Sequence, residues 1–326
     1  MRMTARLLVI VPMVAALCAW ATNASANSPR LGSTSPRAQS RQLAGHGYQF
    51  NGPDALALSG GHLFVANYGG NSVTEIDAAT GKLVRVISGA SYKFFSPSAL
   101  AAKGKDLFVA NLGINSVTSS VTEINASTGK LVRVISAASY KFDLPAALVL
   151  SGRDLFVANS NNSPPSASSV TEINASTGKL VRVISGSRYN FSGPLAFSLW
   201  GRGLFVASPS GNCLTEVTAS TGKLVRVITA SSYEPYHEEL FYGPDALALT
   251  GGDLFVANRY GDTLTEITAF GVSLVRVVSA ASYKFDGPDA LATRGGELFV
   301  ANRYGASLTE VNASTGKLVR VIPASS

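Results

Sequence analysis

Four segments decide the fold: Gly-Pro-Asp-Ala-Leu-Ala-Leu (residues 52–58), Leu-Phe-Val-Ala-Asn (63–67), Ser-Val-Thr-Glu-Ile (72–76) and Thr-Gly-Lys-Leu-Val-Arg-Val-Ile (80–87). The same order of segments occurs six times along the 326 residues. Each copy is marked by a proline near its start: Pro53, Pro97, Pro145, Pro194, Pro244 and Pro288. Successive prolines are 44 to 50 residues apart. A period of about 40–50 residues with four strand-like runs is typical of propeller blades.

Each copy predicts four strands, which in the first copy cover 55–58, 63–67, 72–76 and 83–87. The proline comes just before the first strand, where its missing N–H does no harm. The second run is almost continuously apolar and suits burial on both faces, and the fourth is rich in β-branched residues. Between the third and fourth, Asp77 and Gly81 predict a hairpin turn. The sequence therefore predicts an all-β fold, a six-bladed β-propeller with four antiparallel strands per blade.

The first 40 residues differ from the repeats. Residues 1–26 predict a secretory signal peptide, with two arginines, a short apolar run and the small-residue sequence Ala24-Ser25-Ala26. Residues 27–40 are rich in Ser, Pro and Arg and predict a disordered leader. The propeller then covers 41–326, with blades at about 50–93, 94–141, 142–190, 191–241, 242–284 and 285–326. We expect a secreted or cell-envelope protein with no membrane span, because no apolar run reaches the ~20 residues that a spanning helix needs.

Residues 41–50 repeat the end of a blade. Arg41 to Gly45, with Tyr48 and Phe50, align with Arg85 to Gly89, Tyr92 and Phe94. We interpret residues 41–45 as the remnant of a fourth strand, which lies against the last blade and helps to close the ring. The last copy also has a fourth strand of its own, at 318–322.

The charge of the chain gives no sign of a nucleic-acid partner. The formal net charge is +7, but residues 1–50 hold five arginines and no acid. The rest of the chain has 22 basic and 20 acidic residues, which leaves no basic footprint for nucleic acid.

Without the signal peptide, Cys213 is the one remaining cysteine, so no internal disulfide is expected. We predict that Cys213 is a half-buried strand residue and that the protein is a monomer.

Two charged positions recur in all six copies and predict six cross-strand ion pairs between the arms of each hairpin. Exposed pairs of this kind contribute about 0.2–1 kcal/mol each. The pairs are Glu75–Arg85, Glu123–Arg133, Glu172–Arg182, Glu216–Arg226, Glu266–Arg276 and Glu310–Arg320. A recurring aromatic step, such as Tyr92 and Phe94, is predicted to wedge between neighbouring blades.

The run from Leu63 to Lys82 resembles the YVTN-type propeller repeat, which NHL repeats share in part. The resemblance covers about residues 41–326 and implies an extracytoplasmic β-propeller, a class used mostly for binding. Related rings include enzymes: streptogramin-lyase-like rings use His and Glu, and gluconolactonase-like rings use acidic and amide ligands around a metal. The site motif of neither enzyme family can be placed on this sequence residue by residue.

The irregular loops are expected on one face of the ring, because strand direction alternates. The loops between second and third strands share this face, the loop face, with the blade-to-blade connections. Insertions occur there at about 118–120, 161–168 and 234–239. Loops on a rigid scaffold are frequent carriers of function.

The first candidate site is metal-binding. Asp54, Asp245 and Asp289 begin the inner strands of blades 1, 5 and 6, which are neighbours once the ring closes. Three carboxylates near the channel could hold a hard cation such as Ca²⁺. The alternative is a turn cap repeated in the three best-preserved copies.

The other candidates are ligand-binding. Arg259, Tyr260, Arg303 and Tyr304, with Tyr68, mark the same sector and are residue types favoured at binding hot spots. His237 lies in the one non-repeated charged cluster, with Glu234, Glu238 and Glu239, and such a cluster suits acid–base or metal chemistry. Solvated loops explain both groups as alternatives.

We expect a secreted scaffold that binds a protein or another cell-envelope component, without a required cofactor and without catalysis. The alternative function is a metal-assisted, lactonase-like hydrolase or lyase with its site at the channel mouth.

Overall fold

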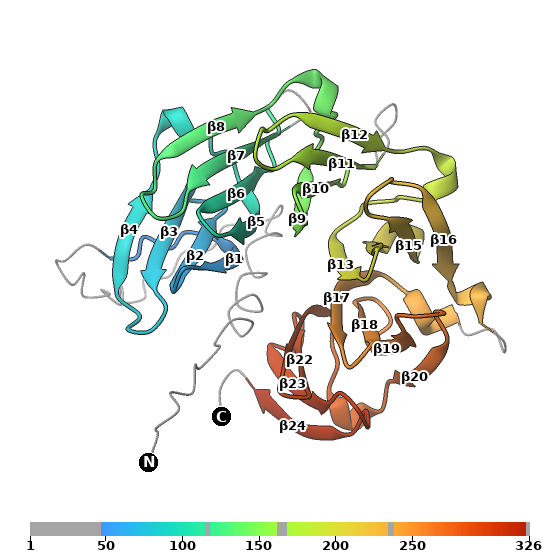
Figure 1. Cartoon of the computed structure of the whole chain (residues 1–326). Coiled ribbons are helices and arrows are strands. Elements are labelled where there is room, and N and C mark those ends of the chain that lie inside the picture. The colour runs from blue at the N-terminus through green and yellow to red at the C-terminus, as the bar shows by residue number, and fades with distance from the viewer. Residues whose placement is uncertain (1–46, 115–117, 162–167, 234–237, 324–326) are drawn as a thin grey trace, which may run out of the picture.

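The computed structural model describes residues 47–114, 118–161, 168–233 and 238–323. It contains six sheets of four antiparallel strands, and within each sheet the strands neighbour one another in chain order. The sheets are arranged around a common axis, with the first strand of each blade innermost and the fourth outermost (Figure 1). The predicted all-β, six-bladed propeller is confirmed. The predicted signal peptide, the leader and residues 41–46 lie outside the described residues.

The strands of the first three blades are β1 (Pro53–Ser59), β2 (His62–Asn67), β3 (Ser72–Asp77), β4 (Leu83–Ile87), β5 (Pro97–Lys103), β6 (Asp106–Asn111), β7 (Ser120–Asn125), β8 (Leu131–Ile135), β9 (Pro145–Ser151), β10 (Asp154–Asn159), β11 (Ser169–Asn174) and β12 (Leu180–Ile184). Those of the last three blades are β13 (Ala196–Trp200), β14 (Gly203–Ser208), β15 (Cys213–Thr218), β16 (Leu224–Thr229), β17 (Pro244–Thr250), β18 (Asp253–Asn258), β19 (Thr263–Thr268), β20 (Leu274–Val278), β21 (Pro288–Arg294), β22 (Glu297–Asn302), β23 (Ser307–Asn312) and β24 (Leu318–Pro323). The second, third and fourth strands lie where the sequence predicts them. Most first strands extend back to the proline itself.

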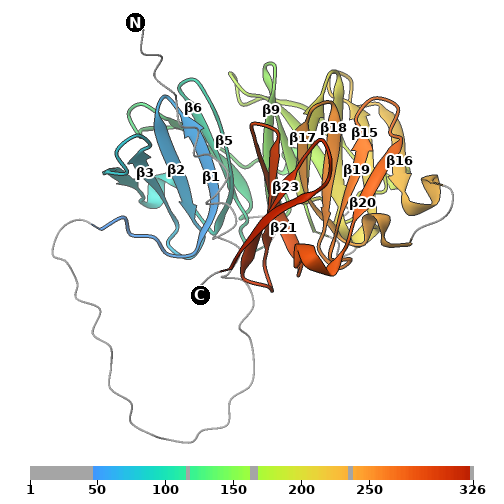
Figure 2. The same ribbon diagram turned by 90° about the horizontal axis from the view of Figure 1, so that it is seen from below.

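Seven short 3-10 helices occur in the connections of the described chain: η3 (Ala90–Tyr92), η4 (Ala138–Tyr140), η5 (Ser187–Tyr189), η6 (Pro209–Gly211), η7 (Ala230–Ser232), η8 (Glu238–Phe241) and η9 (Ala281–Tyr283). Figure 2 shows from the side how the sheets stand next to one another. In the described ranges, no helix has the length and apolar character needed to cross a membrane.

The hydrophobic core lies between the blades. Five apolar clusters each combine residues of two consecutive blades. Between blades 1 and 2, for example, Phe64 and Ile87 pack with Leu107 and Ile124. Because both faces of a blade are apolar, each blade buries its faces only against its neighbours. We call each blade-to-blade interface a seam.

The six predicted Glu–Arg ion pairs are all present. Each glutamate lies directly opposite its arginine in the ladder of the third and fourth strands, with Nε to Oε2 distances of 2.5 to 2.8 Å. The contribution given above for exposed pairs does not apply here, because the carboxylates are buried. The Glu172 side chain is 1% exposed and Arg182 is 31% exposed. The glutamate faces the packed side of its sheet, and its charge is compensated there by the arginine.

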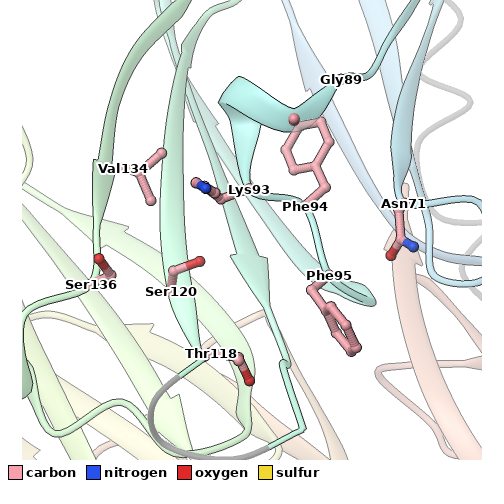
Figure 3. Close-up of a pocket in the computed structure, with 10 residues that line it drawn as sticks. Asn71, Gly89, Lys93, Phe94, Phe95, Thr118, Ser120, Val134 and Ser136 are labelled. Carbon is pink, nitrogen blue, oxygen red and sulfur yellow. The ribbon is translucent and has the colours of Figure 1, made fainter.

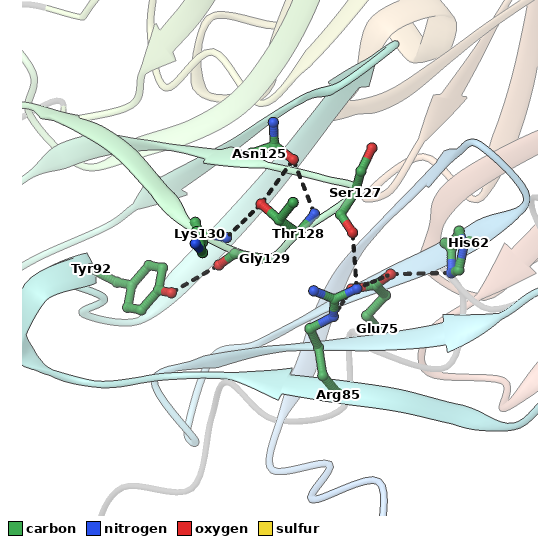
Figure 4. A network of polar contacts seen from close by, with 9 residues as sticks. All are labelled: His62, Glu75, Arg85, Tyr92, Asn125, Ser127, Thr128, Gly129 and Lys130. Atoms are coloured by element: carbon green, nitrogen blue, oxygen red, sulfur yellow. Dashed lines mark hydrogen bonds and ion pairs between the residues drawn. The ribbon is translucent and has the colours of Figure 1, made fainter.

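Most of these arginines also reach the next blade (Figure 4). Arg85 Nη2 donates to the carbonyl of Ser127, in the hairpin turn of blade 2, at 3.1 Å. The same bond to the following blade recurs from Arg133, Arg182 and Arg276. Arg226 also reaches the following blade, but through Nη1 and to the carbonyl of Gly271, at 3.5 Å. One side chain therefore neutralises a buried carboxylate in its own blade and fastens that blade to its neighbour.

The aromatic step fills the same seams, as predicted. Tyr92 stacks on Phe94, with ring centroids 5.3 Å apart, and both pack against the cluster between blades 1 and 2. The Tyr92 hydroxyl donates to the carbonyl of Gly129 at 2.8 Å, and Thr122 Oγ1 donates to the carbonyl of Tyr92. The predicted hairpin turns are also capped by a side chain, since Asn125 Oδ1 accepts the N–H of Thr128.

Replacing Arg182→Ala is expected to lower the free energy of unfolding by about 3 kcal/mol, because it leaves the buried Glu172 carboxylate uncompensated. Lys179→Ala, at an exposed lysine of the adjacent turn, is the control and should change it by less than about 0.5 kcal/mol. Urea unfolding of the two variants and the wild type measures both effects. Equal stability of the two variants would contradict this assignment.

Candidate functional site

The candidate arginines and aspartates of blades 5 and 6 meet on the loop face. Arg259 directly follows β18, and Asp245 lies next to Pro244 at the start of β17. Because Pro244 pairs with Asn258 in the antiparallel ladder, the two charged side chains become neighbours. Arg259 Nη1 lies 3.3 Å from Asp245 Oδ2. The same register in blade 6 places Arg303 Nη1 3.6 Å from Asp289 Oδ2.

Arg259 also joins blade 5 to blade 6. Its Nη2 donates to the hydroxyl of Tyr304 at 2.9 Å. Its Cζ lies 5.7 Å from the ring centroid of Tyr260 and 5.5 Å from that of Tyr304, within the range of cation–π attraction. The two tyrosines are 56% and 58% exposed, so the guanidinium is held between two aromatic rings that remain open to solvent.

Two glycines fix the positions of these rings. Gly243 has φ of +70° and Gly287 has φ of +62°, in the left-handed region that favours glycine. A Cβ built at Gly243 would collide with the Tyr260 ring, and one at Gly287 with the Tyr304 ring. Each tyrosine ring therefore packs directly against the backbone of its own blade. We call Arg259, Tyr260, Arg303 and Tyr304 the Arg–Tyr cluster.

The three candidate aspartates lie in the same sector. Burial raises the pKa of Asp54 to about 6, although Arg303 lowers it. Burial, followed by the nearby Asp245 charge, raises the pKa of Asp289 to about 6. Within the described ranges, no three His, Cys, Asp or Glu side chains are grouped so that they could hold a metal ion. Asp245 and Asp289 are instead paired with arginines, and Ca²⁺ binding stays a prediction.

The remaining candidates are spread more widely. Tyr68 is half-buried and directly follows β2, where it takes in blade 1 the place of Arg259. His237 lies outside the described residues. Cys213 was predicted to be half-buried, but it is fully buried. It lies in β15, between β14 and β16, and its Sγ accepts a hydrogen bond from Asn190 Nδ2. Burial raises the pKa of the Cys213 thiol to about 11, which disfavours the reactive thiolate.

Two cavities open near the loops. The smaller, of about 180 Å³, is lined by Asp245, Arg259 and Tyr260 together with Ser160, Leu195 and Pro209. It places Arg259 and Tyr260 of the Arg–Tyr cluster at the edge of a recess. The larger, of about 620 Å³, lies between blades 1 and 2 and is lined by Asn71, Lys93, Phe94, Phe95, Thr118 and Ser120 among others (Figure 3).

Sequence reasoning missed two aromatic residues of these surfaces. Phe95 is 40% exposed in the larger cavity, and Tyr242 is 49% exposed with its ring 5.8 Å from that of Tyr260. Both residues take the repeat position that holds the polar Asn51, Asp143 or Asp286 in other copies. An exposed aromatic residue at a position that is polar elsewhere in the repeat is the signal that could have identified them.

Comparison with known proteins places the repeats in one family. The sequence profile of the family described as outer membrane protein assembly factor BamB matches residues 46–228, which is more than half of the chain. No curated protein matches the sequence.

Several solved structures share the fold. Hydrazine synthase of Kuenenia stuttgartiensis is 18% identical, with a TM-score of 0.66 over 86% of this chain and 89% of that one. A catalytically inactive virginiamycin B lyase of Staphylococcus aureus, with quinupristin, is 15% identical, with a TM-score of 0.67 over 85% of each chain. A streptogramin B lyase is 13% identical, with a TM-score of 0.66 over 85% of this chain and 84% of that one. At these identities the likeness shows the fold alone.

The raised pKa of Asp289 predicts a pH-dependent stability. The folded pKa of about 6 exceeds the ordinary 3.8, so the folded state favours the protonated carboxyl. The stability from this group is complete below about pH 4 and is lost as the pH rises through 6. Asp289→Asn mimics the protonated form, so its melting temperature relative to wild type should rise between pH 4 and pH 7.

Asp77→Asn is the matched control with the opposite sign. Hydrogen bonds from Thr80 lower the pKa of Asp77, so the wild-type carboxylate adds stability that is lost as the pH falls. Melting curves from pH 4 to pH 7 test both variants. An Asp289→Asn difference that stays flat over this range would contradict the assigned burial of Asp289.

Proposed function

Since the chain belongs to the family described as outer membrane protein assembly factor BamB, we propose that it is a cell-envelope or secreted scaffold that binds a protein partner. The partner binds the loop face of blades 5 and 6. The observation that carries this proposal is the Arg–Tyr cluster: exposed aromatic rings and a guanidinium, fixed in place by the backbone of two blades.

The chemistry of the cluster suits protein recognition. Tyr and Arg are enriched at the hot spots of protein interfaces. Tyr260 and Tyr304 keep more than half of their surface exposed, which leaves apolar area to bury on binding. Their rings rest on Gly243 and Gly287, and Arg259 is held by Asp245 and Tyr304, so little side-chain entropy is lost when a partner docks.

Sequence features support a location outside the cytoplasm. The predicted signal peptide at residues 1–26 and the YVTN-like repeats both favour an extracytoplasmic protein.

The larger cavity at Phe95 extends the same loop face towards blades 1 and 2.

Alanine variants test the proposed docking surface. The partner is first captured from cell-envelope extract, identified and purified, and its affinity is then measured by calorimetry. Tyr260→Ala and Tyr304→Ala should each weaken binding at least tenfold, about 1.4 kcal/mol, as expected for a hot spot. Arg153→Ala, an exposed arginine in the β9–β10 turn on the opposite face, is the control and should leave affinity unchanged. Unchanged affinity in both tyrosine variants would refute this docking surface.

A further inference from the structure

The two faces of the ring differ in charge. The face opposite the loop face contains two turns from every blade: the turn between the first and second strands, and the hairpin turn between the third and fourth. We call it the turn face, and the strands of each blade run between it and the loop face (Figure 2). In five blades the hairpin turn carries an exposed lysine at the same position: Lys82, Lys130, Lys179, Lys223 and Lys317.

The turns between the first and second strands add five further cations. These are Lys103, Lys105, Arg153, Arg202 and Arg294, and all five are exposed. Among the described residues, none of the ten cations of the turn face takes part in an ion pair. Their charges therefore face the solvent without an acidic partner in contact.

The acidic residues of the same turns are fewer and less exposed. Asp77, Asp106, Asp154, Asp253 and Glu297 are all half-buried. Ten basic against five acidic residues give the turn face a net charge of +5. Apart from the six Glu–Arg pairs, the rest of the described chain lies towards the loop face and holds six basic and eight acidic residues. The near balance of charge in the propeller thus conceals one strongly basic face.

Blade 5 has no basic residue in either of these turns and carries an aromatic residue instead. Phe270 takes the turn position that holds Ser127 in blade 2, and it is 88% exposed. No other large hydrophobic side chain of the described chain is as exposed. Trp200, at the end of β13 in blade 4, is 38% exposed on the same face. The turn face therefore combines cations with exposed aromatic surface.

The turn that presents Phe270 is held in one conformation. Val272 has φ of +58°, where the other copies have glycine, and this is strained for a β-branched residue. Its side chain is buried in the cluster between blades 4 and 5, which keeps it in place. Thr268 Oγ1 donates to the carbonyl of Phe270 and accepts the N–H of Ser273, both at 2.9 Å. Strain of this kind is concentrated at functional sites.

The arrangement of these turns suits a flat partner. Each of the two kinds of turn has the same length in all six blades, so the turns end at similar levels around the ring. Cations spread around a ring can contact a plane together, whereas nucleic acid is bound along a patch or stripe. A membrane surface rich in anionic lipids attracts clustered lysines and arginines, and an aromatic side chain beside them inserts at the boundary of headgroups and acyl chains.

We propose that the turn face docks on the surface of an anionic lipid membrane. The lysines and arginines bind the lipid phosphate groups. Phe270 inserts its ring among the headgroups, flanked by Lys223 of blade 4 and Lys317 of blade 6. The loop face then points away from the membrane and stays open. Docking of this kind rests on the turn face alone and requires no partner on the loop face.

Co-sedimentation of the full chain with lipid vesicles tests the docking. The probes are vesicles of phosphatidylcholine alone and vesicles of an equal mixture of phosphatidylcholine and phosphatidylglycerol. Binding to the neutral vesicles is the baseline, because it includes any contribution of the apolar run at residues 7–21. The wild type should bind the anionic vesicles at least about tenfold more tightly, and added salt should weaken this binding.

Variants of the turn face locate the contact. Lys223→Glu combined with Lys317→Glu should weaken binding to the anionic vesicles at least about twentyfold, at about fivefold for each lost basic charge. Lys141→Glu combined with Lys284→Glu makes the same change at exposed lysines of the loop face, and should change binding by less than about twofold. Phe270→Ser introduces the residue of other blades and should weaken binding about fivefold or more. Circular dichroism verifies that each variant is folded.

Three results would overturn the proposal. Equal binding of the wild type to both kinds of vesicle would show that anionic lipid is not recognised. Equal losses in the two double lysine variants would show that net charge, and not the turn face, governs binding. A loss in the turn-face lysine variant without any change in Phe270→Ser would show that no ring inserts, and would assign the face to a soluble polyanion such as nucleic acid.

Discussion

Each blade of this propeller has two apolar faces, and only a neighbouring blade can cover them. The five clusters found between consecutive blades meet this constraint. The repeated ion pair contributes to the same interfaces, because its glutamate is buried in one blade while its arginine bonds to the turn of the next. A charge that must be neutralised locally is thus used to hold two sheets together. The stability of any blade therefore depends on its neighbours.

A rigid ring allows short loops to present side chains in fixed positions. The second strand of every blade ends on the loop face, and the residues that follow it differ between copies. In blades 5 and 6 these residues are Arg and Tyr, and the antiparallel register brings an aspartate beside each arginine. In blade 1 the corresponding residues are Tyr68 and Gly69. Variation of two residues on a constant scaffold accounts for the Arg–Tyr cluster.

Much of this architecture follows from the sequence, because the repeat reports strand number, order and register. The opposition of Glu75 and Arg85 follows from the hairpin alone. The burial of the glutamate does not, since it depends on how closely the next blade packs. For the aspartates the sequence left two interpretations open, a cation site and a repeated turn cap, and neither paired them with the arginines at the ends of the adjacent strands. Pairing of Pro244 with Asn258 decides their surroundings. Phe95 was missed because the interpretation rested on residues that the copies share, whereas Phe95 is a position where one copy differs from the others.

The central claim is that a seam is the unit in which interactions cooperate, and a double-mutant cycle tests it most directly. Arg133 and Tyr140 both donate to carbonyls of one hairpin turn, those of Ser176 and Gly178, whereas Tyr189 donates to Gly222 in the next seam. Combining Arg133→Ala with Tyr140→Phe should give a coupling of at least ~0.5 kcal/mol in the free energy of unfolding. Combining Arg133→Ala with Tyr189→Phe should be additive. Additivity in both cycles would contradict the claim.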